Sequence, residues 1–304
     1  MTRMRFAVVG TGYWARQTHA AALAAHPDAD LVAVWGRSLA RATELAEAVG
    51  ARPYQNVDEM FADVDAVAFA VPPDIQADLA VRAARAGCHL LMDKPVAFTS
   101  KDADRIVEAV DHAGVRSLVF FTSRFTASQA DWLTEVQRQP AWNCGYVRMY
   151  ASIFEPGNPF GQSEWRRSRG ALWDIGPHAL SILLPALGPV TYVVADHGLG
   201  DMVTIVLHHE SGATSTISLS LTAPAGSRGS FWQVFGQDRQ MSMPEATTTP
   251  VEAMGQCISA LLTEQPGGWH HPCDVRFGRD VVRVLEAADL FLQRPLASRS
   301  QSIG

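Results

Sequence analysis

Residues 5–26 read RFAVVGTGYWARQTHAAALAAH and carry the strongest structural signal of the chain. The continuous apolar run RFAVVG ends in Gly10, and such a run is typical of a strand buried on both faces. From residue 13 to residue 26, alanines and a leucine recur at helical spacing. The stretch therefore predicts a buried strand, a tight glycine turn and a helix.

The same alternation continues to residue 122. Further apolar strands are predicted at 30–36, 64–72, 88–95 and 115–121, with helices at 38–50, 74–87 and 100–114 between them. Alternating strands and helices predict a parallel sheet that is covered by helices on both faces. This part of the chain, residues 1–122, is expected to form a Rossmann-type α/β domain.

After residue 123 the pattern changes to short strands that alternate apolar with polar residues. Strands are predicted at 146–154, 190–197, 202–209, 213–221 and 230–236, and helices near 250–264 and 274–293. Short turn signals between strands favour antiparallel hairpins, and the alternation indicates one uncovered face. Residues 123–304 are therefore expected to form an α+β domain with a mainly antiparallel, open sheet. Its exposed face suggests a homo-oligomer, a dimer or a tetramer.

The composition excludes several classes of protein. Hydrophobic residues make up 47% of the chain and the net charge is −6, which argues against general binding to nucleic acid or to anionic membranes. The four cysteines form no CxxC pair, and no apolar run approaches the roughly 20 residues of a membrane span. The first apolar run is also too short for a signal peptide, so a cytoplasmic protein is expected.

The histidines do not indicate a metal site. His270, His271, Cys273 and Asp274 lie close together in the sequence. However, adjacent histidines in a loop rarely point at one ion, and His208 and His209 fall on opposite faces of a strand. We therefore expect no bound metal.

The glycine turn predicts a dinucleotide site. Gly10, Gly12 and Ala15 form a GxGxxA fingerprint at the start of a strand–helix unit. The first glycine permits the turn, the second lets the backbone approach a pyrophosphate, and the small third residue allows close packing of helix and strand. The helix N-terminus then presents N–H groups and a positive dipole end to the phosphates.

The residues after the second strand favour NADP over NAD. An NAD site usually has an acidic residue there to bind the ribose 2′-OH, but this chain has Trp35, Gly36, Arg37 and Ser38. Arg37 can pair with a 2′-phosphate and Ser38 can hydrogen-bond it. The alternative is that Arg37 is a solvated loop residue and that NAD is used.

Lys94 is the candidate for chemistry at the same edge of the sheet. Asp93, Lys94 and Pro95 end a predicted strand, and open α/β sheets bind ligands beyond the carboxyl ends of their strands. A lysine there can hydrogen-bond a substrate hydroxyl, stabilise charge as hydride leaves, and pass on a proton if its pKa is lowered. A lone DKP is otherwise typical of a surface lysine.

Taken together, the motifs resemble the glucose–fructose oxidoreductase / inositol dehydrogenase (Gfo/Idh/MocA) family. The matching segments are GTGYWA (10–15), DKP (93–95), SRF (123–125), EWR (164–166), GALWDIGPH (170–178) and HPCDVRFGRDVVRVLEAA (271–288). They preserve the family's order and spacing nearly from end to end. Three positions depart from it: Asp93 stands where glutamate is more frequent, Gln76 where histidine is common, and Arg169 where glycine is frequent.

The resemblance implies that Lys94, Asp174 and His178 are catalytic. Four residues apart on one helix, Asp174 and His178 would face the same way and meet Lys94 across the domain crevice. An imidazole pKa of about 6.5 suits His178 as general base or acid, and Asp174 would orient it or bind a substrate hydroxyl. Without the resemblance, the same pair is a helix salt bridge worth about 0.3–0.5 kcal/mol.

The remaining site residues are assigned around these three. The expected cofactor-binding residues are Gly10, Gly12, Tyr13, Trp14, Ala15, Arg37, Ser38, Val71, Pro72, Gln76, Asp93 and Lys94. The expected substrate-binding residues are Arg124, Trp165, Arg166 and Trp173. Arg124, Trp165 and Arg166 are equally compatible with holding the two domains together.

The sequence thus predicts an NAD(P)-dependent oxidoreductase, with NADP preferred, that acts on a hydroxyl-bearing carbon. The resemblance implies a sugar, a cyclic polyol or a related small molecule as substrate. Two alternatives remain open: a dinucleotide-dependent glycoside hydrolase of the same fold, and a non-catalytic sensor that binds dinucleotide and a partner protein.

Overall fold

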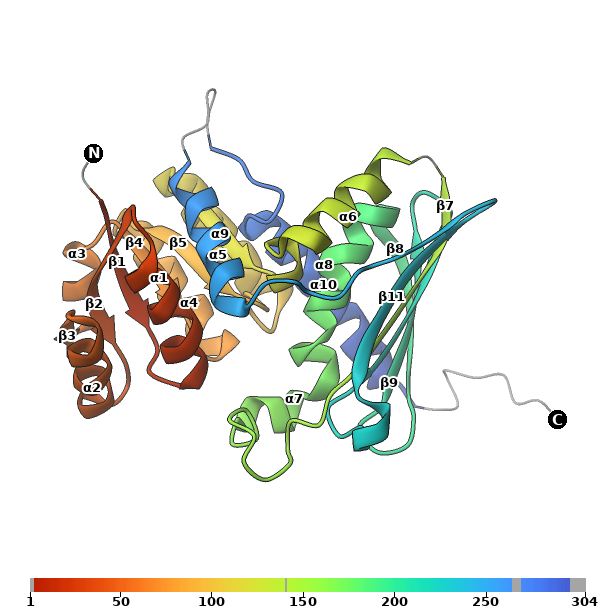
Figure 1. Cartoon of the computed structure of the whole chain (residues 1–304), viewed down its shortest axis with the longest axis horizontal. Coiled ribbons are helices and arrows are strands. Elements are labelled where there is room, and N and C mark those ends of the chain that lie inside the picture. The colour runs from red at the N-terminus through yellow and green to blue at the C-terminus, as the bar shows by residue number, and fades with distance from the viewer. Residues whose placement is uncertain (1–2, 140, 264–268, 296–304) are drawn as a thin grey trace. The chain divides into compact units, whose positions relative to one another are not determined.

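The computed structural model describes residues 3–139, 141–263 and 269–295, which form two compact units. The first unit contains the described residues up to 130 together with 245–282, and the second contains 131–244 together with those from 283 onward. A division at residue 122 assigns 245–263 and 269–282 to the second domain, whereas in the structure these residues belong to the first unit. Each unit has its own sheet (Figure 1).

The first unit has a six-stranded sheet in the order β3-β2-β1-β4-β5-β6, with all strands parallel. The strands are β1 (Met4–Val9), β2 (Ala29–Trp35), β3 (Arg52–Tyr54), β4 (Ala66–Phe69), β5 (His89–Asp93) and β6 (Ser117–Phe120). Every residue of β4 and β6 is buried, as expected for strands covered on both faces. The predicted Rossmann-type sheet is confirmed, and the three-residue strand β3 is an addition to it.

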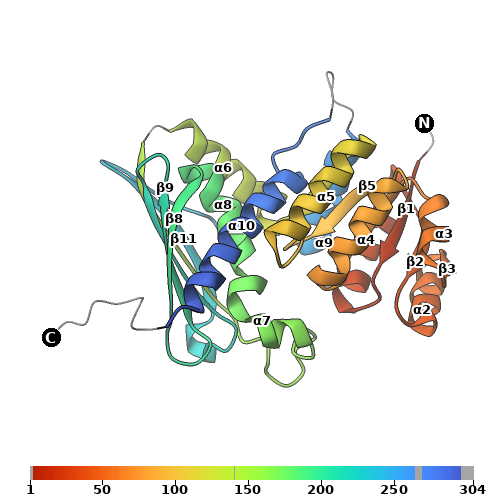
Figure 2. The same ribbon diagram turned by 180° about the vertical axis from the view of Figure 1, so that it is seen from behind.

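Helices cover both faces of this sheet. They are the π-helical turn η1 (Ala15–Ala20), α1 (Ala21–Ala25), α2 (Leu39–Val49), α3 (Val57–Ala62), α4 (Pro73–Arg85), α5 (Ser100–Ala113), the 3₁₀ turn η2 (Thr122–Arg124) and α9 (Pro250–Leu262). Helices α1 and α9 pack together in front of the sheet in Figure 1, and Figure 2 shows α4 and α5 on its other face. Helix α9 thus brings the late part of the chain onto the edge near β6.

The second unit has a mixed six-stranded sheet in the order β12-β11-β7-β10-β9-β8. Its strands are β7 (Trp142–Tyr150), β8 (Val190–His197), β9 (Val203–His209), β10 (Thr214–Ser220), β11 (Gly229–Gly236) and β12 (Gln240–Ser242), with the 3₁₀ turn η3 (Ala225–Ser227) before β11. Strands β7 and β10 pair in parallel, and the other four pairs are antiparallel. The mainly antiparallel sheet is confirmed, with one parallel pair at its centre.

One face of the second sheet packs against helices α7 (Glu164–Asp174) and α8 (Gly176–Leu187). Two further helices, α6 (Ala127–Arg138) and α10 (Val275–Leu292), each have some residues assigned to the first unit and some to the second. Leu172, Leu180, Ile217 and Leu285 meet in the core between helices and sheet. On the opposite face, none of the described elements covers the strands (Figures 1 and 2).

The described residues include no helix that combines the length and the apolar character needed to span a membrane.

Candidate active site

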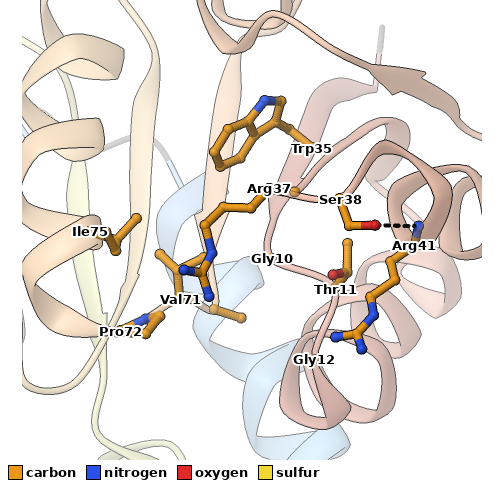
Figure 3. A pocket seen from close by; sticks show the side chains of 12 residues that line it. Gly10, Thr11, Gly12, Trp35, Arg37, Ser38, Arg41, Val71, Pro72 and Ile75 are labelled. Atoms are coloured by element: carbon orange, nitrogen blue, oxygen red, sulfur yellow. Dashed lines mark hydrogen bonds between the residues drawn. The ribbon is translucent and has the colours of Figure 1, made fainter. Parts of the chain in front are cut away.

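A pocket of about 440 Å³ lies at the carboxyl ends of β1, β2 and β4 (Figure 3). The residues that line it are Gly10, Thr11, Gly12, Trp35, Gly36, Arg37, Ser38, Arg41, Ala70, Val71, Pro72 and Ile75. Six of the residues assigned to cofactor binding from the sequence are therefore neighbours here: Gly10, Gly12, Arg37, Ser38, Val71 and Pro72. The edge at which this pocket lies is the one where open α/β sheets bind ligands.

The backbone of the glycine turn fits a dinucleotide. Gly10 has φ +127°, and a Cβ placed on it would lie 2.4 Å from the carbonyl oxygen of Ala70. A Cβ on Gly12 would meet no atom within 4 Å, so the missing side chain leaves open space at the wall of the pocket. Gly10 is thus required by the fold, whereas Gly12 leaves room beside the backbone for a bound pyrophosphate.

Two arginines flank the pocket. The Arg37 side chain extends from the end of β2 toward Val71 and Pro72, and the Arg41 guanidinium points toward Gly12 (Figure 3). Ser38 is the N-cap of α2, and its hydroxyl oxygen accepts a hydrogen bond from the Arg41 backbone N–H at 3.4 Å. Among the described residues that line this pocket, none is acidic, so its polar wall favours anions.

Three other residues assigned to the cofactor occupy the turn without lining this pocket. Tyr13 is 50% exposed, Ala15 is fully buried, and the Trp14 ring stacks on Phe120 with centroids 6.5 Å apart. The small size of Ala15 allows η1 to approach the sheet, as the fingerprint predicts. Trp14 therefore joins the glycine turn to the end of β6.

His19 lies beneath this turn and is fully buried. Neither ring nitrogen has a hydrogen-bond partner within the described part of the chain, and the ring meets Trp14 and Phe120 edge to face. Burial lowers the pKa of His19, while the charge of Asp93 and the carbonyl groups of Trp14 and Phe69 act in the opposite direction. His19 is therefore a neutral imidazole close to the DKP segment.

The DKP segment follows β5 and contains a cis bond between Lys94 and Pro95. Asp93 and Lys94 are partly exposed, and Asp93 Oδ1 accepts a hydrogen bond from the Lys94 backbone N–H at 2.8 Å. The Asp93 carboxylate thus stabilises the turn at its own lysine. Lys94 and Lys101 are the two lysines of a chain with 25 basic Lys and Arg residues.

Gln76, which the sequence assigns to cofactor binding, contacts the DKP segment. It is 1% exposed and does not line the pocket described above, because its carboxamide is directed at the DKP segment. Its Nε2 donates to the carbonyl oxygen of Asp93 at 2.8 Å, and its Oε1 accepts from the Asp93 backbone N–H at 2.9 Å.

In the second unit, Asp174 and His178 do not share one helix. Helix α7 ends at Asp174 and α8 begins at Gly176, with Ile175 between them at φ −109°. Gly170 also breaks the regular geometry of α7, with φ +66° and ψ −163°. The predicted alignment of these two side chains by i,i+4 spacing on one helix is therefore wrong. Glycine and proline in GALWDIGPH are the physical reason, since both interrupt helices.

Asp174 instead pairs with Arg166 from the first turn of α7. Arg166 Nε lies 3.0 Å from Asp174 Oδ1, and the Asp174 side chain is 8% exposed. The Arg166 guanidinium lies over the rings of Trp165 and Phe160, at 4.5 Å and 5.1 Å from their centroids. The EWR and GALWDIGPH motifs thus form one cluster, with a buried carboxylate and a cation held on two aromatic rings.

Two other residues that the sequence assigns to substrate binding, Trp173 and Arg124, also make contacts within the protein. The Trp173 ring is buried, and its Nε1–H donates to the carboxylate of Asp289 at 3.2 Å. Arg124, at the end of η2, lies over the Phe277 ring at 5.5 Å from its centroid. The positive charge of Arg124 and, above all, burial lower the pKa of the nearby His271 to about 4. Within the first unit, Arg124 therefore connects β6 to the late segment.

Sequence reasoning missed Thr11, Arg41 and His19. Arg41 follows Arg37 by four residues at the start of a helix, a spacing that places both near the same helix N-terminus. Thr11 lines the pocket, and a Cβ on Gly36 would lie 2.7 Å from its methyl group, so the two segments approach closely. The meeting of Lys94 with Asp174 and His178 involves both units and stays a prediction.

Comparisons with known proteins agree with the motifs. Residues 4–121 match the model of the oxidoreductase family with an NAD-binding Rossmann fold, and residues 143–242 match the GFO/IDH/MocA C-terminal domain. The chain belongs to this family of NAD(P)-binding oxidoreductases.

Among similar proteins is a dTDP-3,4-didehydro-2,6-dideoxy-α-D-glucose 3-reductase of Streptomyces antibioticus, 31% identical over 192 residues, which cover 62% of this chain and 58% of that protein. Inositol 2-dehydrogenase of Rhizobium meliloti is 28% identical over 240 residues, covering 73% of this chain and 70% of that one. A dehydrogenase of Bordetella pertussis, solved with NADH and UDP-GlcNAcA, has a TM-score of 0.79 at 23% identity and covers 96% of both chains.

Proposed function

We propose that this protein is a dehydrogenase or reductase that transfers hydride between a nicotinamide dinucleotide, preferably NADP, and a hydroxyl-bearing carbon of a sugar, cyclic polyol or related compound. The observation that carries the proposal is within the first unit. A glycine-turn pocket and Lys94 are built on the carboxyl ends of neighbouring parallel strands. The nicotinamide supplies the hydride chemistry when bound.

Lys94 is the group best suited to the substrate hydroxyl. Of the 25 Lys and Arg residues, all but Lys94 and Lys101 are arginines, which stay protonated in proteins. A lysine ammonium can donate hydrogen bonds to the hydroxyl oxygen and can also release its proton if its surroundings lower its pKa. The chain thus has a residue capable of proton transfer where the ligand of a parallel sheet is expected.

The preference for NADP rests on the charge of the pocket. Arg37 and Arg41 bring two guanidinium groups to the end of β2, and the described lining residues include no carboxylate to bind a ribose 2′-OH. A guanidinium pairs well with a phosphate, and the N-terminus of α2 adds a favourable dipole. Ser38 keeps its hydroxyl proton free for the phosphate, because its oxygen is the acceptor in the N-cap.

The second unit contributes the residues proposed to bind and deprotonate the substrate. Asp174 and Arg166 offer an acceptor and donors, with the Trp165 ring beside them, which suits a ligand rich in hydroxyl groups. His178 is partly exposed and is proposed as the general base or acid. The named substrates of the relatives, a dTDP-sugar and inositol, belong to the same chemical class.

We also propose that a second copy of the chain covers the open face of the second sheet. Tyr192 and Phe231 are 55% and 39% exposed there, and Tyr146 lies beside Phe231 with ring centroids 5.9 Å apart. Aromatic side chains on a broad, uncovered sheet face are typical of protein interfaces.

A fluorescence titration tests the cofactor assignment. We expect NADPH to bind at least about tenfold more tightly than NADH, a difference of about 1.4 kcal/mol. Arg37→Ala and Arg41→Ala should weaken NADPH binding and leave NADH binding nearly unchanged, whereas Arg85→Ala, an exposed arginine of α4 outside the pocket, should change neither. Equal or tighter NADH binding would refute the NADP preference, and binding of neither would refute the enzyme itself.

A screen of sugars and polyols with the preferred cofactor then tests the reaction. Net formation of NADPH with a polyol or sugar supports a dehydrogenase. Cleavage of a glycoside without net cofactor turnover would instead support a dinucleotide-dependent hydrolase.

A further inference from the structure

We propose that Gln76 is a positioning residue for Lys94, an inference that rests on the proposed catalytic role of that lysine. Gln76 lies in the first turn of α4, and its side chain is almost completely buried. Every polar atom of its carboxamide is directed at the segment that carries Lys94. The residue therefore acts on the reaction through the backbone of the DKP turn.

The carboxamide takes the place of a missing strand segment. Strands β4 and β5 are paired up to Ala68 and Leu91, and β4 ends at Phe69. Asp93 lies beyond this last pair, yet its N–H and C=O are both hydrogen-bonded by Gln76, at 2.9 Å and 2.8 Å. A carboxamide has the same donor and acceptor as a peptide group, so Gln76 extends the ladder by one residue on this side.

The same amide nitrogen also holds the chain after the lysine. Gln76 Nε2 lies 3.2 Å from the carbonyl oxygen of Pro95 and 3.3 Å from that of Val96. Lys94 is thus fixed on both sides, and the Asp93 carboxylate binds its N–H from within the turn. On the other edge of β5, Asp93 pairs with Phe120 of β6. The backbone of Lys94 consequently has little freedom, which suits a group that must meet a substrate hydroxyl in one orientation.

Two substitutions separate positioning from simple packing. Gln76→Glu keeps the size and the acceptor oxygen but replaces the N–H donor with a charged oxygen that faces three carbonyl groups. Gln76→Leu removes both functions and keeps most of the volume. Asp74→Ala, an exposed residue in the same helical turn, is the matched control.

The chain permits a readout that does not depend on the substrate. Lys94 and Lys101 are its two lysine side chains, so competitive acetylation followed by peptide mass spectrometry compares one with the other. In Gln76→Leu and Gln76→Glu, we expect the acetylation rate of Lys94 relative to Lys101 to change by at least about threefold across a pH series, because the turn that holds Lys94 is released. The ratio in Asp74→Ala should equal that of the wild type.

Kinetics completes the test. Both Gln76 variants should lower kcat at least about tenfold, while the NADPH dissociation constant stays within about twofold, because Gln76 does not line the dinucleotide pocket. A selective loss of NADPH affinity would show that Gln76 binds the cofactor instead. An unchanged Lys94 labelling ratio in variants that merely melt at lower temperature would also overturn the inference. If labelling changes but Lys94→Ala retains activity, Gln76 still positions the lysine and the proposed function fails.

Discussion

The two sheets of this protein have the same number of strands and use them in opposite ways. In the first, strands such as β4 and β6 are buried on both faces, and the candidate site lies at the strand ends. In the second, β9 alternates buried with less buried residues, and the candidate site lies on the helices that cover one face. A sheet covered on both faces can offer only its ends to a ligand, whereas a sheet covered on one face also has a broad surface free for a partner.

The first prediction concerns chemistry at the ends of the first sheet. Lys94→Ala should lower kcat by about 1,000-fold, within the range of about 10²–10⁴ typical of lost acid–base groups. Lys101→Ala, at the exposed start of α5, is the control and should retain full activity. Steady-state kinetics with the substrate found in the screen measures both. If Lys94→Ala keeps more than a tenth of the wild-type kcat, the reaction is not centred on the strand ends of the first sheet.

The second prediction separates two glycines of the same turn. In Gly10→Ala the new Cβ would lie 2.4 Å from a backbone oxygen at a residue with φ +127°, so we expect a loss of about 2–4 kcal/mol of stability. In Gly12→Ala the Cβ would meet nothing in the protein, so stability should stay within about 0.5 kcal/mol, while NADPH binding should weaken at least about tenfold. Thermal unfolding and fluorescence titration measure the two effects. If Gly10→Ala is as stable as the wild type, Gly10 is not required by the fold. If Gly12→Ala binds NADPH normally, Gly12 is not required by the ligand.

The same contrast explains what the sequence could predict of the fold. The first sheet follows from apolar runs such as RFAVVG, because strands buried on both faces need a continuous apolar sequence. Strand β3 was missed because RPY is short and contains proline. The parallel pairing of β7 with β10 could not be predicted, since it joins residues about 70 positions apart and depends on what lies between them.

The candidate site was predictable where it rests on backbone requirements. The roles of Gly10 and Gly12 can be predicted because the steric requirements of a tight turn are visible in the sequence. The role of Arg37 can be predicted because the acidic residue usual after β2 is missing. Gly176 and Pro177 are the sequence signal for the break after Asp174, but the spacing of acid and histidine favours one helix. The role of Gln76 had no local signal, because its partners Asp93, Pro95 and Val96 lie 17 to 20 residues away.

The third prediction tests the free face of the second sheet. If a second copy covers this face, Tyr192→Arg combined with Phe231→Arg should weaken the dimer by at least about 100-fold, because each charge would be buried without a partner. Leu290→Arg on α10, which is 57% exposed, is the control on the helical side of the unit. Sedimentation equilibrium gives the dissociation constant. If the doubly substituted protein keeps the wild-type mass, or the wild type is itself a monomer, then the open face has another use.

The smallest effect concerns the two neighbouring histidines of β9, which face opposite sides of the second sheet. His209 is 4% exposed, and its Nδ1 and Nε2 contact the carbonyl oxygen of Gly188 at 2.7 Å and the Ser215 hydroxyl at 2.9 Å. Burial lowers the pKa of His209, against the raising effect of the Gly188 carbonyl. A neutral ring satisfies both partners, with Nδ1–H donating to Gly188 and Nε2 accepting from Ser215.

Because the pKa of His209 is lower in the folded protein, the unfolded chain binds the extra proton first. Stability contributed by the neutral ring is therefore complete above about pH 6.5 and declines as the pH falls below that value, by at most about 1.4 kcal/mol per pH unit. Urea unfolding at pH 7.5, 6.5 and 5.5 should show a smaller decline for His209→Asn than for the wild type. His208→Asn, on the exposed side of the same strand, removes only the smallest cause of the lowered His209 pKa, the repulsion from His208, and should stay close to the wild-type curve. If stability falls with pH equally steeply in both variants, the histidines on the buried and the open faces of this sheet contribute equally to the pH dependence.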